Sequence, residues 1–212
     1  MAILGYIVVS LIAYLLGSIP TGFLVAKARG MDIRTAGSGN IGAANTFRAV
    51  GKTAGIIVLL IDALKGYVAV KVCDIILQYF NVPESGMENY RILAGVFAVL
   101  GHNYTCWLHF KGGKGIATSA GVYLALAPLA VLYAVAAFIL GFGLTRYASV
   151  GSMLAAIALP VAVYFTQDNW TLRIVTIALG VLALLKHRTN MRRLMAGTEN
   201  RVDFRKKSSA PK

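Results

Sequence analysis

The stretch ILGYIVVSLIAYLLGSIPTGFLV, residues 3–25, decides the fold class, because it carries no charged side chain over a length that crosses a bilayer. A transmembrane helix needs about 20 consecutive apolar residues, since the hydrocarbon core is about 30 Å thick. Further apolar runs follow at 54–73, 90–107, 116–145, 149–166 and 171–186. The sequence therefore predicts an all-α polytopic membrane protein.

The composition of the whole chain indicates a membrane domain without a separate water-soluble domain. Of the 212 residues, 58% are hydrophobic and 14% are charged, against about 45 to 50% and about 25% in soluble domains. At about 20 residues per crossing, the chain has room for at most about eight crossings with short connections. We expect a single integral membrane domain over residues 1–212, with a basic tail at about 187–212.

The run at 116–145 is longer than one crossing requires. Pro128 lies in its middle, and proline removes a backbone donor and disrupts a helix interior. We therefore expect two short tilted helices with a turn near Ala127 to Leu129. This interpretation makes seven transmembrane helices in all.

The charge distribution predicts the orientation of these helices. The chain has 21 Lys and Arg against eight Asp and Glu, a formal net charge of +13. With seven crossings, 17 of the 21 basic residues fall in segments that share one face, namely 26–52, 107–115, 146–148 and 186–212. By the positive-inside rule, the C-terminus and the glycine-rich loops are cytoplasmic and the N-terminus is external. In a bacterium, this predicts a multi-pass protein of the cell (inner) membrane.

The basic loops indicate anionic partners. A chain with little soluble surface meets anionic membrane lipids and phosphorylated substrates before it meets nucleic acid. We therefore expect no nucleic acid partner.

The segment AGSGNIGAANTFR, residues 36–48, is the most unusual loop. Its small residues allow successive backbone N–H groups to converge on an anion, and amide, hydroxyl and guanidinium donors stand among them. The predicted phosphate-binding residues are Gly37, Ser38, Gly39, Asn40, Gly42, Asn45, Thr46 and Arg48. The alternative is that the glycines only permit close helix packing, which explains neither the asparagines nor the arginine.

Two nucleotide-binding motifs are matched only formally. Residues 37–42 fit G-x-G-x-x-G, but residues 31–36 are polar where the motif requires a strand. Residues 51–53, Gly-Lys-Thr, match the end of a P-loop, but Thr46 stands where its first glycine would be. Neither match predicts a nucleotide site.

A second glycine-rich turn, FKGGKG, occupies residues 110–115. Its flexible backbone allows amide groups and a lysine ammonium to reach one oxyanion together. The predicted phosphate-binding residues here are Gly112, Gly113 and Lys114, with His102 and Asn103 as further candidates. The alternatives are an ordinary basic loop on the cytoplasmic side and a purely structural histidine.

The third polar segment, KHRTNMRR at 186–193, follows the last apolar run. His187, Asn190 and Arg193 share one helix face, where they can hold a phosphate and position a hydroxyl group. Glu199 is a further candidate. The alternative, a basic stop after the last helix, predicts only lysine and arginine.

Two pairs of polar residues lie within the apolar runs. Ser149 and Ser152, one turn apart, are candidate donors to the same anion, although helix packing by small residues explains them equally well. Asp62 and Lys65, also one turn apart, can neutralise each other inside the membrane. We expect these two to form a structural ion pair.

The sequence predicts neither a metal nor a cofactor. On the cytoplasmic side, the only carboxylates are those of Asp32, Glu199 and Asp203, which do not form the cluster that a magnesium site needs. The H-x-x-x-x-D pattern of one large class of acyltransferases is absent. A metal-free reaction on anionic substrates is therefore expected.

Six segments together resemble the bacterial membrane acyltransferases that use acyl phosphate to acylate glycerol 3-phosphate. In order, they are residues 17–22, 37–45, 62–66, 101–102, 112–115 and 187–190. The resemblance implies a cytoplasmic active site that makes 1-acyl-glycerol 3-phosphate and phosphate, the first acylation of phospholipid synthesis. The residues expected to be catalytic are Ser38, Lys114, His187 and Asn190.

The residues are also compatible with alternatives. The proton of the acceptor hydroxyl can pass to His187 or to the acyl phosphate oxygens. A membrane carrier or channel for organic phosphates would need similar basic loops, and a structural lipid-binding subunit is a third interpretation. An enzyme that produces acyl phosphate is a candidate partner for the basic tail.

Overall fold

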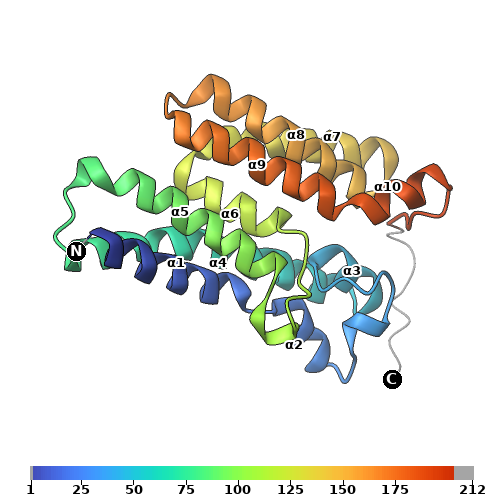
Figure 1. Cartoon of the computed structure of the whole chain (residues 1–212). Coiled ribbons are helices and arrows are strands. Elements are labelled where there is room, and N and C mark those ends of the chain that lie inside the picture. Colours follow the sequence, from blue (N-terminus) through green and yellow to red (C-terminus); the bar gives the residue numbers. More distant parts are fainter. Residues whose placement is uncertain (1, 203–212) are drawn as a thin grey trace. The chain divides into compact units, whose positions relative to one another are not determined.

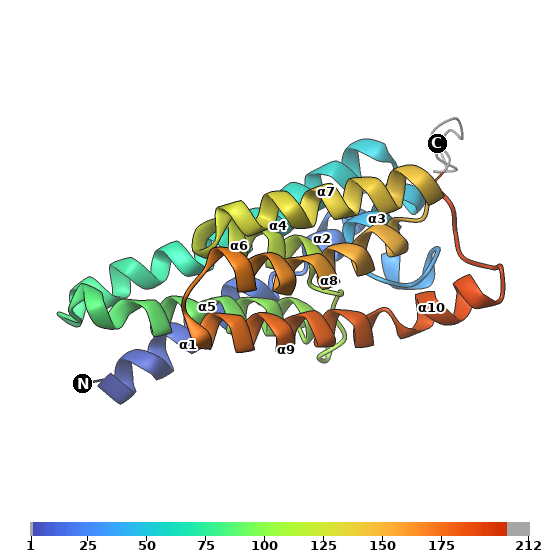
Figure 2. The same ribbon diagram turned by 90° about the horizontal axis from the view of Figure 1, so that it is seen from above.

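The computed structural model describes residues 2–202, and every regular element within them is a helix (Figure 1 and Figure 2). The predicted all-helical class is confirmed. The described residues form two compact units, which meet in sequence between Leu126 and Ala127.

The first unit contains four long helices and four short ones. The long helices are α1 (Ala2–Ser18), α4 (Lys52–Tyr79), α5 (Glu84–Asn103) and α6 (Ile116–Leu126). The short ones are α2 (Thr21–Lys27), η1 (Ile33–Thr35), α3 (Ala43–Ala49) and η2 (Cys106–Leu108).

The first apolar run is one candidate membrane span, Ile3–Lys27, but it is not one continuous helix. The chain leaves helical geometry at Ile19 and Pro20, between α1 and α2. Proline cannot donate a backbone hydrogen bond, and it disfavours helical geometry in the residue before it. The first predicted crossing is therefore a candidate span with a break at Ile19 and Pro20.

The long helices of the first unit pack with their backbones close together. α1 packs against α5, and α4 packs against both α5 and α6. A Cβ atom at Gly17 would overlap the backbone of Ala98, and one at Gly121 would overlap the backbone of Ala63. Glycine is required at these two crossings because the facing backbones lie where a side chain would be.

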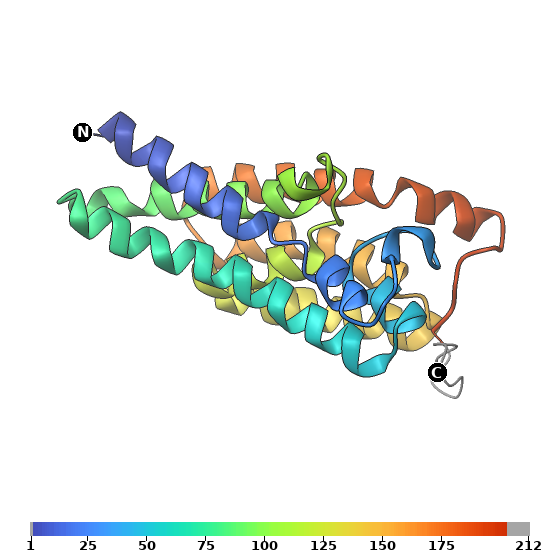
Figure 3. The ribbon, with the colours of Figure 1, turned by 90° about the horizontal axis from the view of Figure 1, so that it is seen from below.

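Helix direction brings the two glycine-rich loops to one end of the first unit. α1 and α5 run one way, and α4 and α6 run the other way, so residues 28–51 and 104–115 lie at the same end (Figure 1 and Figure 3). One buried hydrophobic cluster includes residues from both loops and from the helices beside them: Ala26, Ile33, Ile41, Val50, Ala54 and Leu108. This cluster anchors the two loops to each other.

The second unit contains α7 (Pro128–Thr145), α8 (Ala148–Thr166), α9 (Trp170–Lys186) and α10 (Arg188–Met195). α8 packs against α7 and α9, and the axis bends by 50° between α9 and α10. The backbone N–H of Val202 donates to the carbonyl of Arg146 at 2.9 Å. The segment after α10 therefore returns to the turn between α7 and α8.

The break predicted within 116–145 is confirmed, with a shift in its position. Only Ala127 separates α6 from α7, and Pro128 is the first residue of α7. Proline is tolerated there because the first N–H of a helix has no intrahelical partner. Leu129, which we expected in the turn, already belongs to α7.

Length and apolarity alone identify fewer than seven spans within residues 2–202. Three candidate spans qualify, at Ile3–Lys27 (α1 and α2 together), Pro128–Thr145 and Ala148–Thr166, and the bent pair of α9 and α10 would be a fourth. α4 is long enough but contains five charged residues, among them Asp62 and Lys65. The count of seven stays a prediction.

Candidate functional site

Asn45 organises the first glycine-rich loop. Its side-chain amide donates to the carbonyls of Ala36 and Asn40, both at 2.9 Å, and its Oδ1 accepts from the backbone N–H of Ser38 at 2.9 Å. The side chain is only 2% exposed. Asn45, which we expected to bind phosphate, thus uses its amide to hold the loop.

The neighbouring polar side chains also bind the loop itself. Asn40 Oδ1 accepts from the N–H of Gly42 at 2.9 Å, and the Thr46 hydroxyl donates to the Gly42 carbonyl at 3.2 Å. Gly37 and Gly39 have φ angles of +59° and +69°, a region that favours glycine. The loop is therefore held by its own hydrogen bonds, and Ser38 and Arg48, both half-buried, stay its candidate contacts to substrate.

The second turn is held by the end of α5. The N–H of Gly112 donates to the Asn103 carbonyl at 3.2 Å, and the N–H of Gly113 donates to the His102 carbonyl at 3.0 Å. Lys114 is half-buried and lies two residues before α6 begins. His102 and Asn103 thus support the turn through their backbones.

His187 lies at the bend between α9 and α10 and is buried. Its Nδ1 is 2.8 Å from the carbonyl oxygen of Ala183. Because a carbonyl oxygen only accepts, this contact requires the proton on Nδ1. In the neutral ring, Nε2 is then the nitrogen that can accept a proton.

Glu199 is the centre of a buried network in the second unit. Its Oε1 accepts from Asn190 at 2.6 Å and from the Ser149 hydroxyl at 2.9 Å, while its Oε2 accepts from Arg193 Nε at 2.6 Å. These bonds join α8 and α10. Ser149, which we expected to donate to an anionic ligand, donates here to a carboxylate of the protein, while Ser152 is half-buried on α8.

The network keeps Glu199 ionised. Burial raises the pKa of its carboxyl group, but the hydrogen bonds from Arg193, Asn190 and Ser149 together lower it further, so the pKa lies below its ordinary value. The negative charge partly neutralises the cationic helix α10. It also fixes the side chain of Asn190, which approaches the carboxylate with its amide nitrogen.

The predicted residues thus fall into two groups. In the first unit, the segments 37–48 and 102–114 lie at the same end (Figure 3), and they hold Gly37, Ser38, Gly39, Asn40, Gly42, Asn45, Thr46, Arg48, His102, Asn103, Gly112, Gly113 and Lys114. The second unit brings together Ser149, Asn190, Arg193 and Glu199 by hydrogen bonds, with His187 at the start of α10 and Ser152 on α8.

Two roles were missed in the sequence. The expected ion pair between Asp62 and Lys65 is confirmed at 2.8 Å, but His102 also lies beside Asp62, with its Nδ1 at 3.7 Å from Oδ1. The Thr105 hydroxyl donates to the Ser18 carbonyl at 2.5 Å. Both contacts join residues far apart in the chain, so no local pattern could have indicated them.

Long apolar helices joined by loops rich in glycine, amides and cations are typical of a helical membrane protein. Residues 7–197 match the family model described as glycerol-3-phosphate acyltransferase. A glycerol-3-phosphate acyltransferase from Geobacter sulfurreducens is 47% identical over 199 residues, which cover 93% of this chain and 98% of the relative. One from Geobacter metallireducens is 51% identical over 189 residues, covering 89% and 93%.

Solved structures agree with these relatives. PlsY (YgiH), described as an integral membrane glycerol 3-phosphate acyltransferase, is 34% identical, and its glycerol 3-phosphate form superposes with a TM-score of 0.84, covering 93% of this chain and 96% of PlsY. Its lysophosphatidic acid form gives a TM-score of 0.81, covering 93% and 95%. The chain belongs to the glycerol-3-phosphate acyltransferase family, which confirms the predicted family and enzyme class.

Proposed function

We propose that this glycerol-3-phosphate acyltransferase takes its acyl group from acyl phosphate and transfers it to the 1-hydroxyl of sn-glycerol 3-phosphate. The products are 1-acyl-sn-glycerol 3-phosphate (lysophosphatidate) and inorganic phosphate. One observation carries the proposal: the candidate site residues carry a hydroxyl, cations, an imidazole and an amide, which suit two phosphate esters. PlsY, a relative, has been solved in glycerol 3-phosphate and lysophosphatidic acid forms.

The chemistry needs positioning more than activation. The acceptor oxygen attacks the acyl carbon, its proton passes to a base, and the bond between the acyl carbon and the phosphate oxygen breaks. Phosphate is a good leaving group, so the main barrier is to bring two dianions together and to stabilise the charge on the transition state. Fixed cations and amides lower that barrier.

Each loop receives a role in this reaction. The loop at 37–42, with the Ser38 hydroxyl, binds the acyl phosphate. The acceptor is bound by Arg48, Lys114, His187 and Asn190. The acyl chain lies among the apolar helices, with membrane lipids around it.

His187 is the better candidate for the base. Its Nδ1 is engaged by the Ala183 carbonyl, so Nε2 is the nitrogen that can take the hydroxyl proton. The acyl phosphate oxygens are the alternative acceptor. No covalent acyl-enzyme is required in either case.

The helix directions support the predicted topology. Within each unit, the basic loops lie at one end: residues 28–51 and 104–115 in the first, residues 146–147 and 187–202 in the second (Figure 1). We propose seven transmembrane helices in one domain of a bacterial inner membrane, with the N-terminus external and the basic loops cytoplasmic. The tail beyond residue 202, suggested as a docking segment for an acyl-phosphate-producing enzyme, lies outside the described residues.

One experiment tests the proposed reaction. Purified protein in liposomes receives labelled glycerol 3-phosphate with either palmitoyl phosphate or palmitoyl coenzyme A. Lysophosphatidate should form with palmitoyl phosphate and not with the thioester. Product from the thioester alone would overturn the donor assignment, and trapped, unmodified label would indicate a carrier.

The assignment of the cations has its own test. Replacement of Lys114 or Arg48 by alanine should remove about 2 to 4 kcal/mol of transition-state stabilisation, the range measured for single preorganised donors. The measurement is kcat/KM with both substrates varied. Near-normal turnover in both variants would reject these roles.

A further inference from the structure

A group of ionisable side chains is buried between the helices of the first unit, apart from the residues assigned to substrate. Asp62 and Lys65 lie on α4, and His102 lies near the end of α5; each is at most 6% exposed. Lys65 Nζ is 2.8 Å from Asp62 Oδ1, and His102 Nδ1 is 3.7 Å from the same oxygen. Neutralisation of one charge by another would explain the pair but not the histidine.

Within this group, Lys65 contacts the backbone at the break in the first span. Lys65 Nζ donates to the carbonyl of Ile19 at 2.8 Å. That carbonyl lies between α1 and α2, where Pro20 interrupts the helical hydrogen bonds. The backbone N–H of Thr21 also donates to this carbonyl, at 3.0 Å, so the ammonium is a second donor at the break between α1 and α2.

Within the same group, His102 contacts the second glycine-rich turn. Gly113 donates its N–H to the His102 carbonyl at 3.0 Å, and a Cβ atom built on Gly113 would overlap His102 Nε2. The ring thus lies between the Asp62 carboxylate and the backbone of Gly113. Lys114 is the next residue along the turn.

We propose that Asp62, Lys65 and His102 are positioning residues, which set the place of Lys114 by holding the turn at 112–115 against α4. The inference rests on the proposed function, in which Lys114 binds glycerol 3-phosphate. Asp62 orients the imidazole, the imidazole sets how closely Gly113 approaches, and Lys65 fixes the same carboxylate to the break in the first span. Contact between these side chains and substrate is not required.

The first test is the variant Asp62→Asn, with steady-state rates measured against both substrates. A displaced Lys114 should raise KM for glycerol 3-phosphate about tenfold, since small misplacements of binding groups have effects of this size or larger. KM for palmitoyl phosphate should stay unchanged. A merely destabilised protein would instead lose active enzyme, which lowers the apparent kcat without changing either KM.

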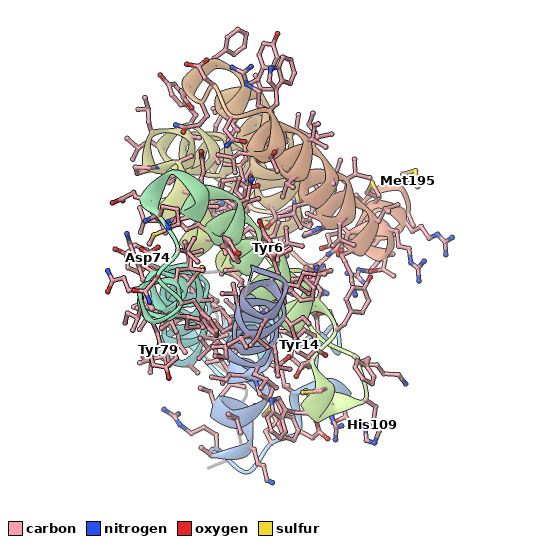
Figure 4. All side chains as sticks on the ribbon, turned by 60° about the vertical axis from the view of Figure 1, so that its left-hand side comes forward. Tyr6, Tyr14, Asp74, Tyr79, His109 and Met195 are labelled. Atoms are coloured by element: carbon pink, nitrogen blue, oxygen red, sulfur yellow. The ribbon has the colours of Figure 1, made fainter. Side chains whose placement is uncertain are left out.

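Asp74→Asn is the matched control. Asp74 lies on the same helix, α4, next to α5 (Figure 4), and is paired with Arg91 at 2.6 Å. The same substitution there also removes an ion pair between a carboxylate and a cation. Both KM values should remain those of the parent enzyme.

The second test does not depend on the folding of Asp62→Asn. Gly113→Ala is made in the parent chain and in His102→Ala, which removes the ring that the new methyl group meets. In the parent, KM for glycerol 3-phosphate should rise about tenfold, and in His102→Ala the same change should have little further effect, because neighbouring residues act non-additively. If the two substitutions instead change KM for glycerol 3-phosphate independently, so that their fold-changes multiply in the double variant, the proposal is overturned.

Lys114→Ala separates failure of this inference from failure of the proposed function. If Lys114→Ala leaves KM for glycerol 3-phosphate unchanged, the proposed function is wrong at that residue. If Lys114→Ala raises this KM while the His102 and Gly113 effects multiply independently, only the positioning role is wrong.

Discussion

Each of the two polar loop regions of this chain is organised by one central residue, and the two central residues differ in kind. In residues 36–46, the centre is a neutral amide, Asn45, which bonds to three backbone groups of its own loop. In residues 187–202, the centre is an anion, Glu199, which accepts from three side chains on two helices. The first region therefore depends on the shape of a glycine-rich backbone, and the second depends on charge. Four substitutions or conditions can test this difference.

The largest effect is expected at the charged centre. Glu199→Ala leaves three buried or half-buried donors without their acceptor, and it should lower the free energy of unfolding by about 3 kcal/mol, because single hydrogen bonds to charged groups contribute about 1.5 to 3 kcal/mol. Denaturant titration in mild detergent measures the change. Ser152→Ala, on the same helix as Ser149, should leave the stability of the protein unchanged. Equal stability of Glu199→Ala and the parent would show that the network is not a structural centre.

A smaller loss is expected at the neutral centre. Asn45→Ala removes the neutral hydrogen bonds with Ala36, Ser38 and Asn40 and a longer one to the Ile33 carbonyl, and it should lower the free energy of unfolding by about 2 kcal/mol. The same titration measures it, with the exposed Asn200→Ala as the control. A loss larger than that of Glu199→Ala would reverse the proposed ranking of the two centres.

Substitution of a loop glycine should lower the free energy of unfolding by a still smaller amount. Gly37→Ala places a side chain at φ +59° and against Asn45 Oδ1, and left-handed geometry alone costs about 1 to 2 kcal/mol for other residues. Gly30→Ala is the matched control, because Gly30 has φ +72° but nothing within 4 Å of the new atom. The excess loss of stability in Gly37→Ala measures the contact with Asn45. Identical losses would show that backbone geometry alone requires glycine there.

The smallest effect is a dependence of stability on pH. The pKa of Glu199 is lower in the folded protein than its ordinary value of 4.5. The stabilisation is therefore present above about pH 4.5 and is lost as the pH falls through the folded pKa. Melting temperatures measured during acidification should fall less steeply in Glu199→Gln than in the parent. Asn45→Ala should keep the parental slope, since an amide does not titrate in this range; a flattened slope there would contradict the contrast.

Much of the fold could be predicted from local patterns. The apolar runs indicated the helices, and Pro128 indicated that 116–145 forms two of them, because a proline acts on the residues immediately around it. Pro20 acts in the same way, and its interruption of the first run was missed because the surrounding residues remain apolar. α4 and α5 contain charged residues, which lower their mean hydropathy. For these two helices, length supports the prediction of a membrane crossing better than hydropathy does.

The candidate site was less accessible to prediction. The residue types around Gly37, Lys114 and His187 indicated anion binding, because glycine-rich backbone, amide side chains and cations in one segment are typical of anion sites. The hydrogen-bond partners of these side chains could not be predicted from the residue types. Asn45 and Ser149 are polar residues beside glycines and cations, and nothing in that pattern distinguishes a donor to substrate from a donor to the protein.

By itself, the sequence determined the helical membrane class, the separation of basic from apolar segments, and a family resemblance that the relatives confirm. These properties depend on run length, charge and the order of short motifs, all of which are local along the chain. Only the tertiary structure decided that Glu199 gathers Ser149 and Asn190, and that His102 stands between Asp62 and Gly113. Such contacts form when helix packing brings distant residues within a few ångströms, where burial makes each donor require an acceptor.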